Sequence, residues 1–553
     1  MEQPDFWKDK YPQGIAREIN TEVYPTIMHL FKDACRKYAN KPAFSNMGRT
    51  LTFAELDKYS AAVATWFQQN TDLQPGDRVA VQMPNVLQYP VVVFGILRAG
   101  LVVVNTNPLY TAREMQHQFK DAGCKALVAL ANFGHMVEEV LPQTGIRYLI
   151  MTEVGDMMPP LKRLIVNNVV KYVKKMVPDY DLPTAIPFTR LIRANPHKLK
   201  EYTAKPEDIA CLQYTGGTTG VSKGAELTHR SITSNMMQTH AFLSTALQPG
   251  REVMICPLPL YHIFAFGVSC IGMVLGMHTV LITNPRDIPG FVKELQQWDF
   301  TAMMGLNTLF VALMNNPEFR KLNFNKLKLT IAGGMAMQTA VANDWEKLTG
   351  SKVCEGYGMT ESSPVITINP PTAIQIGTIG VPVPNTEVRI VNDNGEDMPL
   401  GEAGELWARG PQVMKGYWQR PEATADTVTA DGWLKTGDVA IVQPDGYIRI
   451  VDRKKDMILV SGFNVYPNEI EEVAVQHAGV LECACVGIPD AKSGESVRLF
   501  VVKKDDSLTE EELMIHMKNN LTGYKVPRTI VFKTELPKSP VGKILRRELR
   551  DKG

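Results

Sequence analysis

A glycine- and hydroxyl-rich segment of this chain is Tyr214-Thr215-Gly216-Gly217-Thr218-Thr219-Gly220-Val221-Ser222-Lys223-Gly224. The apolar run from Ile209 to Leu212 leads into it and predicts a short buried strand. Because glycines let the backbone turn its N–H groups inward, and hydroxyls and an ammonium add donors, the segment suits a polyphosphate. The common P-loop requires Gly-Lys-Ser/Thr, whereas Lys223 follows Ser222 and precedes a glycine. This spacing therefore argues against a kinase or GTPase. A plain glycine-rich hairpin is the alternative to a phosphate-binding loop.

The composition is that of a soluble globular protein with several domains. Its 553 residues exceed a single hydrophobic core, so we expect roughly two to four domains. Hydrophobic residues make up 44% and charged residues 21% of the chain, and a net charge of +1 gives no field that would recruit nucleic acid. Met1 to Lys10 lacks the basic start and apolar core of a secretion signal, so we expect a cytoplasmic protein.

The eight cysteines show no spacing typical of metal ligands. Most lie in apolar surroundings, which indicates buried thiols of a reducing compartment. Cys483 and Cys485 would share one face of a strand, where core packing is the main interpretation and a redox pair is the alternative.

A charge-free segment runs from Val253 to Asn284 and is long enough to cross a bilayer of about 30 Å. Pro257 and Pro259 near its start, two histidines and several small residues argue against a spanning helix. We therefore expect a buried helix that lines an apolar pocket, with a membrane span as the alternative.

The first half of the chain alternates strand and helix patterns. A capping box at Thr52-x-x-Glu55 opens a helix. Apolar runs and periodicity then predict a helix at 89–98 and strands at 78–83, 101–105, 125–130 and 147–152. This alternation implies a largely parallel sheet covered on both faces, which binds ligands beyond the carboxyl ends of its strands.

The pattern changes after about Thr378. Short strands and turns up to residue 452 predict a small antiparallel barrel. In the final segment we expect a helix at 467–476, a strand at 497–503 and a helix opened by Ser507 and Glu510. The predicted fold class is α/β, with doubly wound sheets and a small β-barrel in a large N-terminal domain, and a small C-terminal α+β domain.

Leu161 to Met176 predicts a helix with an apolar face and a basic one. It carries five basic residues and no acid, namely Lys162, Arg163, Lys171, Lys174 and Lys175. A basic amphipathic helix can bind an anionic membrane, with about 1 kcal/mol per basic residue near the surface. Two interpretations stay open: peripheral membrane contact, and a helix packed on its own domain with a solvated basic edge.

Further short motifs follow in order along the chain. Glu355-Gly356-Tyr357-Gly358-Met359-Thr360-Glu361 offers a flat tyrosine face to a base and a carboxylate that can hold Mg²⁺. The others are Asp-Gly-Trp-Leu-Lys-Thr-Gly-Asp at 431–438, Val-Asp-Arg-Lys-Lys-Asp at 451–456 and Leu-Pro-Lys-Ser-Pro-Val-Gly-Lys-Ile at 536–544. Each alone is an ordinary turn or basic loop, but five motifs in this order do not arise readily by chance.

In these motifs the chain resembles the adenylate-forming superfamily of acyl-CoA synthetases, firefly luciferase and peptide-synthetase adenylation domains, over essentially its whole length. Residues 257–262, 452–469 and 545–550 are similar to those of bacterial long-chain fatty acid CoA ligases. The resemblance implies that a fatty acid carboxylate attacks the α-phosphorus of ATP and expels pyrophosphate. The thiol of coenzyme A then attacks the acyl-adenylate and releases AMP. Bringing an anion to a polyanion demands cations and donors arranged beforehand.

The resemblance also implies a role for each motif. The β- and γ-phosphates would be held by Thr215, Gly216, Gly217, Thr218, Thr219, Gly220 and Lys223. Thr215 and Glu361 would bind Mg²⁺. The adenine would be wrapped by Gly334, Glu355, Gly356, Tyr357, Gly358, Met359 and Thr360, with Tyr357 against its ring. Asp438 would accept hydrogen bonds from both ribose hydroxyls with help from Arg453, and Lys543 would bridge the attacking carboxylate and the α-phosphate.

The resemblance divides the chain at a hinge. Residues 1–452 would form the N-terminal domain for ATP and fatty acid, with its barrel part at about 378–452. Residues 453–553 would form a mobile C-terminal domain that rotates near Lys455, itself counted among the nucleotide-binding residues. One conformation would insert Lys543, and the other would open a tunnel for coenzyme A. An ordinary surface turn is the alternative at 453–456. Leu459 stands where some plant-type relatives carry a lysine, so no role is assigned to it.

The resemblance places His262 at the mouth of an acyl pocket, as a catalytic residue, and suggests Phe266 as a gate, with a core residue as the alternative. A long alkyl chain gains about 0.8 kcal/mol per buried CH₂.

We expect a long-chain fatty acid:CoA ligase of fatty acid degradation that uses ATP, Mg²⁺ and coenzyme A. We expect it to lie in the cytoplasm or peripherally on the inner face of the cell membrane. The alternatives are a medium-chain or aryl-acid CoA ligase, an acyl-AMP ligase, and a non-catalytic fatty-acid-binding transport component. No nucleic acid partner is expected, and a homodimer stays open.

Overall fold

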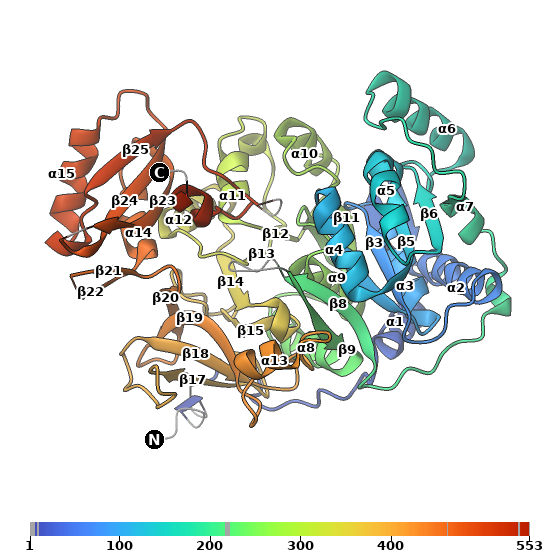
Figure 1. Ribbon diagram of the computed structural model, residues 1–553, viewed down its shortest axis with the longest axis horizontal. Coiled ribbons are helices and arrows are strands. Elements are labelled where there is room, and N and C mark those ends of the chain that lie inside the picture. Colours follow the sequence, from blue (N-terminus) through green and yellow to red (C-terminus); the bar gives the residue numbers. More distant parts are fainter. Residues whose placement is uncertain are drawn as a thin grey trace.

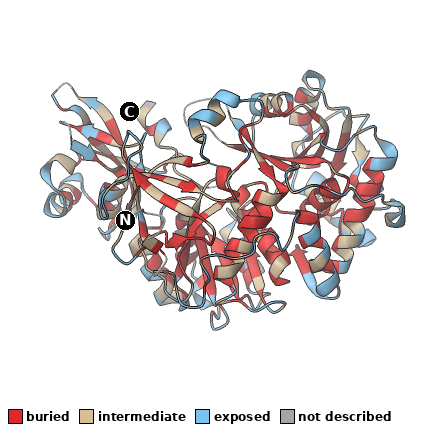
Figure 2. Cartoon of the chain, turned by 90° about the horizontal axis from the view of Figure 1, so that it is seen from below, coloured by how far each residue is buried: buried red, intermediate tan, exposed pale blue. Residues whose placement is uncertain are grey.

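The computed structural model describes residues 6–7, 10–215, 222–461, 463–490, 492–539 and 542–551. Figure 1 shows two wide sheets with their helices, a smaller sheet below them, and the C-terminal domain at one end, coloured orange to red. Figure 2 shows that buried residues fill the sheets and the helices between them, while exposed residues gather at the margins.

One wide sheet has seven strands in the order β7-β6-β5-β3-β4-β8-β9, and only β8 and β9 pair antiparallel. The strands are β3 (Arg78–Gln82), β4 (Val102–Thr106), β5 (Cys124–Leu130), β6 (Tyr148–Thr152), β7 (Ile186–Pro187), β8 (Ile209–Thr215) and β9 (Lys223–Thr228). The strands predicted from apolar runs are confirmed, and the central strand β4 is buried along its whole length, as a parallel strand covered on both faces should be.

The second wide sheet has nine strands in the order β16-β15-β14-β13-β12-β10-β11-β1-β2, parallel in the middle and antiparallel at both ends. The strands are β1 (Pro42–Asn46), β2 (Arg49–Thr52), β10 (Val253–Cys256), β11 (His278–Leu281), β12 (Ala302–Gly305), β13 (Leu329–Gly333), β14 (Val353–Gly358), β15 (Val365–Ile368) and β16 (Val381–Pro382). The predicted α/β class with largely parallel, helix-covered sheets is confirmed.

Helices cover these sheets and join them. They are α1 (Ile27–Lys37), α2 (Phe53–Asn70), α3 (Gln88–Arg98), α4 (Ala112–Ala122), α5 (Gly134–Val140), α6 (Pro160–Asn168), α7 (Phe188–Leu191), α8 (His229–Leu243), α9 (Ile263–Leu275), α10 (Ile288–Leu295), α11 (Asn307–Met314) and α12 (Thr339–Thr349). A further helix, α13 (Pro421–Thr427), contacts β19 (Leu434–Val442) of the smaller sheet. One buried cluster contains side chains of both wide sheets and of α1, α3, α8 and α9. The predicted capping box of Thr52 and Glu55 at the start of α2 is confirmed.

The charge-free segment forms β10, α9 and β11 rather than one long helix. Most of α9 is buried, and part of it lines a cavity, so the prediction of a buried pocket-lining helix is confirmed. Within the described part of the chain, no helix is both long enough and apolar enough to span a membrane.

A small antiparallel barrel was predicted for residues 378–452, and the structure has a four-stranded antiparallel sheet in this region. Its order is β17 (Glu387–Val391), β18 (Gly404–Arg409), β19 (Leu434–Val442) and β20 (Ile448–Arg453). The C-terminal domain follows with β21 (Ile458–Val460), β22 (Phe463–Val465), α14 (Pro467–Val475), β23 (Val480–Asp490), β24 (Gly494–Lys503), α15 (Glu510–Asn520), β25 (Thr529–Lys533) and α16 (Arg546–Asp551).

Two local predictions in the C-terminal domain have different outcomes. Cys483 and Cys485 are buried free thiols in its core, which confirms the packing interpretation. Ser507 does not open α15, because its hydroxyl donates to Asp505 and Thr509 is the residue that caps the helix. The expected helix start at Ser507 is therefore wrong by two residues.

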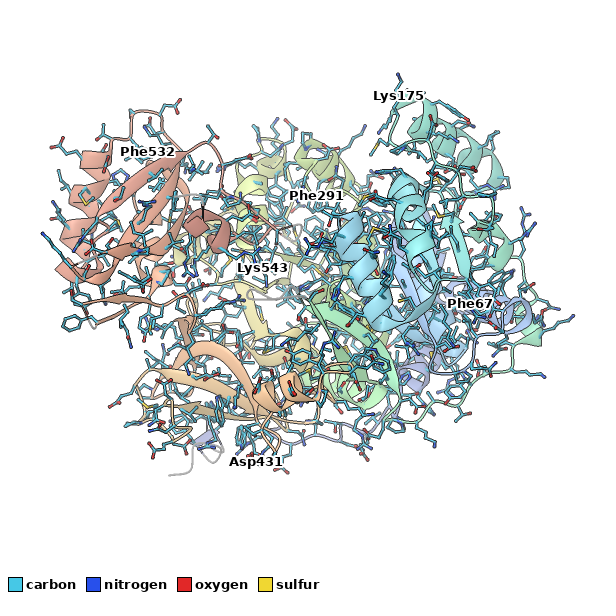
Figure 3. The ribbon with its side chains drawn as sticks, viewed as in Figure 1. Phe67, Lys175, Phe291, Asp431, Phe532 and Lys543 are labelled. Carbon is cyan, nitrogen blue, oxygen red and sulfur yellow. The ribbon has the colours of Figure 1, made fainter. Side chains whose placement is uncertain are left out.

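The basic segment 161–176 forms α6 and a short π-helical turn (Val169–Val173). Six of its large apolar side chains are 54–73% exposed, namely Leu161, Leu164, Ile165, Tyr172, Val173 and Met176. Lys162 Nζ donates to the carbonyls of Met47 and Gly48 at 3.2 and 3.4 Å. The segment also contacts its own domain, because Asn167 Oδ1 accepts a hydrogen bond from Gly155 N at 2.8 Å and Asn167 Nδ2 donates to Glu153 at 2.9 Å. The structure therefore fits both interpretations, and α6 and Lys175 project at the edge of the molecule in Figures 1 and 3.

Candidate active site

The residues predicted for the site converge on one large cavity of about 2380 Å³, lined by both wide sheets, the four-stranded sheet and the C-terminal domain. The predicted residues that line it are Thr215, Lys223, His262, Gly334, Glu355, Gly356, Tyr357, Gly358, Met359, Thr360, Glu361, Asp438, Arg453, Lys455 and Lys543. The remaining loop residues, Gly216, Gly217, Thr218, Thr219 and Gly220, lie outside the described residues.

Lys543 reaches this cavity from the C-terminal domain, and Figure 3 shows it between that domain and the rest of the chain. Its backbone N donates to Ser539 Oγ at 3.1 Å, and its carbonyl accepts from Ser539 N at 2.7 Å. The side-chain Cε lies 3.5 Å from where a Cβ on Gly334 would stand, and the φ of +83° at Gly334 favours glycine. Burial and the nearby Arg453 lower the pKa of Lys543 to about 8, although Asp438 acts in the opposite direction.

His262 caps the N-terminus of α9, where its Nδ1 accepts a hydrogen bond from Phe264 N at 3.3 Å. Burial, together with the Lys543 ammonium, lowers the pKa of this imidazole to about 3. His262 is therefore uncharged at neutral pH. It offers hydrogen bonds at the cavity wall without repelling Lys543.

Tyr357 and Asp438 come from different sheets and meet at the cavity wall. The Tyr357 hydroxyl donates to Asp438 Oδ2 at 2.6 Å. Arg453 lies opposite Asp438 in the register of β19 and β20, and its Nε is 3.5 Å from Asp438 Oδ1. Burial raises the pKa of Asp438, while Arg453 acts to lower it. The cluster places a buried acceptor where hydroxyl groups of a ligand could donate.

Glu361 lies in the short turn after β14 and is 5% exposed. The Tyr417 hydroxyl donates to Glu361 Oε1 at 2.6 Å. Burial raises the pKa of Glu361, while Tyr417 and Lys223 act to lower it. Thr215 and Lys223 pair at the facing ends of β8 and β9.

The oxygens of Glu361 and Thr215 fit magnesium, which binds through one or two carboxylates together with water and substrate phosphates. Within the described ranges, no group of three or more His, Cys, Asp or Glu could hold a metal ion. A magnesium ion at this place would therefore depend on the oxygens of a bound polyphosphate.

Glu355 is a buried carboxyl group on β14, and burial raises its pKa to about 8. Met337 N donates to Glu355 Oε1 at 3.3 Å. Glu355 is therefore mostly protonated at neutral pH and can donate a hydrogen bond at the cavity wall. Gly358, in the same motif, cannot be replaced by a larger residue, because a Cβ there would stand 1.8 Å from the Pro364 carbonyl oxygen.

The apolar part of the cavity lies between α8 and α9. Its walls are Met236, Thr239 and Leu243 from α8, and Gly267, Val268 and Ile271 from α9. The sequence predicted the α9 wall from its lack of charge but missed α8, whose apolar residues are interspersed with polar ones.

The gate predicted at Phe266 is wrong, because Phe266 is 3% exposed and belongs to the core. Phe264, two positions earlier on α9, lines the cavity instead. A Cβ on Gly333 would come 3.3 Å from its ring. The core alternative for Phe266 is confirmed.

Tyr417 is the functional residue that sequence reasoning missed most clearly. It lies in the segment Met-Lys-Gly-Tyr-Trp at 414–418, and its hydroxyl holds Glu361. A lone aromatic residue in a turn-rich region gives no periodic signal. Only its contact with Glu361, 56 positions earlier in the chain, indicates its place in the site.

The large cavity between the main sheets and the C-terminal domain matches the two-part organisation of a known class of nucleotide-binding enzymes. A family model described as AMP-binding enzyme matches residues 31–418, and one described as AMP-binding enzyme C-terminal domain matches residues 469–543. The chain therefore belongs to the AMP-binding, adenylate-forming enzyme family.

Two curated relatives and one solved structure illustrate the likeness. The chain is 55% identical over 551 residues to the long-chain-fatty-acid–CoA ligase of Yersinia pestis, covering 99% of this chain and 97% of that protein. It is 33% identical over 507 residues to the feruloyl-CoA synthase of Amycolatopsis sp., covering 91% and 94%. The structure of ATP-bound MatB from Rhodopseudomonas palustris matches with a TM-score of 0.76 at 27% identity, covering 95% and 98%.

Proposed function

We propose that the protein is an ATP-dependent long-chain fatty acid:CoA ligase, which forms an acyl-adenylate and then acyl-CoA, AMP and pyrophosphate. The observation that carries the proposal is that Lys543, Asp438 and Glu361 line the same cavity as the apolar walls of α8 and α9. The 55% identity to a protein with this name supports the substrate class.

In the proposed first step, the Lys543 ammonium lies between the fatty acid carboxylate and the α-phosphate of ATP and offsets the repulsion between them. A pKa of about 8 leaves this group mostly protonated at pH 7. His262 is neutral and hydrogen-bonds to the carboxylate end of the substrate. No further residue is needed as a base, because the attacking carboxylate is already ionised.

The nucleoside is held at the other wall of the cavity. Asp438 accepts from the ribose hydroxyls, and Arg453 acts to lower the pKa of that carboxyl group, against the effect of burial. Tyr357 packs against the adenine ring, and protonated Glu355 donates a hydrogen bond beside it. Thr215 and Lys223 bind the β- and γ-phosphates. Thr215 and Glu361 would hold magnesium, which would neutralise the charge of the departing pyrophosphate.

The apolar walls favour an alkyl chain over a compact aryl acid. Met236 and Leu243 are seven residues apart on α8, which corresponds to about 10 Å along the helix. A channel of that depth accommodates many methylene groups, each worth about 0.8 kcal/mol when buried. An aryl-acid ligase is the second candidate, since a feruloyl-CoA synthase is 33% identical.

We also propose that the chain divides at residues 452 and 453, with a hinge near Lys455. The C-terminal domain has its own buried clusters, which supports its movement as one body. In the second step it would withdraw Lys543 and open a path for coenzyme A. Lys455 lies at the cavity rim and, with Arg453, would contact the nucleotide in the first conformation.

A peripheral membrane contact through residues 161–176 belongs to the same proposal. Six exposed apolar side chains beside five basic residues match a surface with an apolar interior and anionic headgroups. Such a contact would bring the enzyme to membrane-dissolved fatty acids.

The experiment is pyrophosphate release from purified protein with ATP, magnesium and saturated fatty acids of rising chain length, with and without coenzyme A. The proposal predicts activity that rises towards long chains and acyl-CoA formation when coenzyme A is present. Activity only with short or aromatic acids would overturn the substrate class, and acyl-AMP without thioester would favour an acyl-AMP ligase.

A further inference from the structure

The segment 414–418 runs along the edge strand β9 of the seven-stranded sheet and pairs with it through an isolated β-bridge. Glu226 N donates to the Gly416 carbonyl at 2.8 Å, Lys415 N donates to the Glu226 carbonyl at 3.0 Å, and Trp418 N donates to the Gly224 carbonyl at 2.8 Å. Tyr417 thereby lies opposite Ala225 in an antiparallel bridge along the outer edge of β9. The segment is thus fixed to the strand that follows the predicted phosphate loop.

The same segment is fixed to the turn that carries Glu361. Met414 N donates to the Glu361 carbonyl at 2.8 Å, and the Tyr417 hydroxyl donates to the carboxylate at 2.6 Å. Both side chains are nearly inaccessible to solvent, with exposed fractions of 8% for Tyr417 and 5% for Glu361. A buried hydrogen bond of this length strongly restricts the orientation of the carboxyl group that accepts it.

Tyr417 also contacts the cation at the far end of the loop. Lys223 Nζ lies 5.2 Å from the centroid of the Tyr417 ring, within the range of a cation–π contact. One side chain therefore engages the carboxylate with its hydroxyl and the ammonium with its ring. Among the described residues, no ion pair joins Lys223 to Glu361, although the Lys223 ammonium acts to lower the pKa of Glu361.

We infer that Tyr417 is a positioning residue for the polyphosphate end of the site: it orients the Glu361 carboxylate towards magnesium and separates it from the Lys223 ammonium, which is left to the phosphates. This inference rests on the proposed function of the cavity. A core residue at position 417 would behave differently. Its loss would weaken the fold and lower the affinity for every ligand alike.

The test compares Tyr417→Phe with the wild type by calorimetric titration of ATP with magnesium and of AMP. The ring and the fold are kept, as a thermal melt would verify, and only the hydroxyl is lost. We expect the affinity for magnesium–ATP to fall about tenfold and the affinity for AMP, which lacks the β- and γ-phosphates, to change less than about twofold. Tyr24→Phe is the matched control, because Tyr24 also donates to a carboxylate, Asp33, but lies outside the cavity.

A double-mutant cycle separates positioning from structure. If Tyr417 acts through Glu361, the Tyr417→Phe change has no further effect on magnesium–ATP affinity when Glu361→Gln is already present. Equal losses for AMP and ATP, no loss at all, or additive effects in the cycle would overturn the inference. A wild-type protein that binds no magnesium–ATP would instead overturn the proposed function.

Discussion

The hydroxyl of Tyr357 donates a hydrogen bond of 2.6 Å to the carboxylate of Asp438. The two residues lie 81 positions apart on different sheets, so the bond ties the nine-stranded sheet to the four-stranded one at the wall of the cavity. It also leaves Asp438 facing the space where a ribose would lie, with Arg453 on its other oxygen. The proposed nucleoside site is therefore assembled by tertiary packing.

Replacing Asp438 with Asn should weaken AMP binding by about tenfold to a hundredfold, because a hydrogen bond to a charged group contributes about 1.5–3 kcal/mol. The loss should be confined to the ribose hydroxyls. We therefore expect the wild type to prefer AMP to 2′,3′-dideoxy-AMP in calorimetric titrations and the variant to bind both alike. A variant that keeps the preference would contradict the ribose role.

The pH dependence of adenylation should follow the charge on Lys543. With a pKa of about 8, the ammonium is present below that pH and is lost above it. The kcat/KM for ATP in the adenylation step, which reports ionisations of the free enzyme, should therefore be level below about pH 7, reach about half of that level near pH 8 and fall about tenfold per pH unit above it. In Lys543→Arg, whose guanidinium stays protonated, the remaining activity should not fall over this range. The same fall in the arginine variant would assign the ionisation to another group.

Val268 is half-buried on the channel face of α9, so a larger side chain there should narrow the acyl pocket. For Val268→Phe we expect kcat/KM for oleate to fall at least about tenfold relative to octanoate, since each excluded methylene loses about 0.8 kcal/mol. Octanoate serves as the internal control for folding. An unchanged ratio of the two substrates would show that the chain lies elsewhere.

Membrane contact through 161–176 should depend on charge. The affinity for vesicles containing phosphatidylglycerol, measured by co-sedimentation, should weaken with salt and fall about a hundredfold when Lys171, Lys174 and Lys175 are changed to Glu, as the loss of about 1 kcal/mol for each of three basic residues implies. Reversing the exposed lysines 321, 326 and 347 instead changes the net charge equally and should have little effect. Equal losses in both variants would indicate a general charge effect rather than a membrane-binding helix.

Local signals in the sequence were sufficient for much of the fold. The capping box of Thr52 and Glu55, the apolar strands and the charge-free segment each have a pattern that acts over a few residues. The short motifs likewise led to Tyr357, Glu361, Asp438 and Lys543, which all line one cavity.

The parts that the sequence did not predict depend on contacts between distant segments. Tyr417 meets Glu361 only because the segment 414–418 pairs with β9. The α8 wall was missed because Met236 and Leu243 belong to the channel only once α8 packs against α9. The sequence left a gate and a core residue open at Phe266, because Phe264 and Phe266 lie on one apolar helix and only packing decides which of them lines the cavity.

The central claim is that Lys543 enters the cavity to bring carboxylate and α-phosphate together, and the separate half-reactions of Lys543→Ala test it most directly. Oleate-dependent exchange of labelled pyrophosphate into ATP should fall by about 10²–10³-fold, the usual cost of removing one preorganised donor. Conversion of preformed oleoyl-AMP to oleoyl-CoA should stay within about threefold of the wild type. An equal loss in both half-reactions, or no loss in the exchange reaction, would contradict the account.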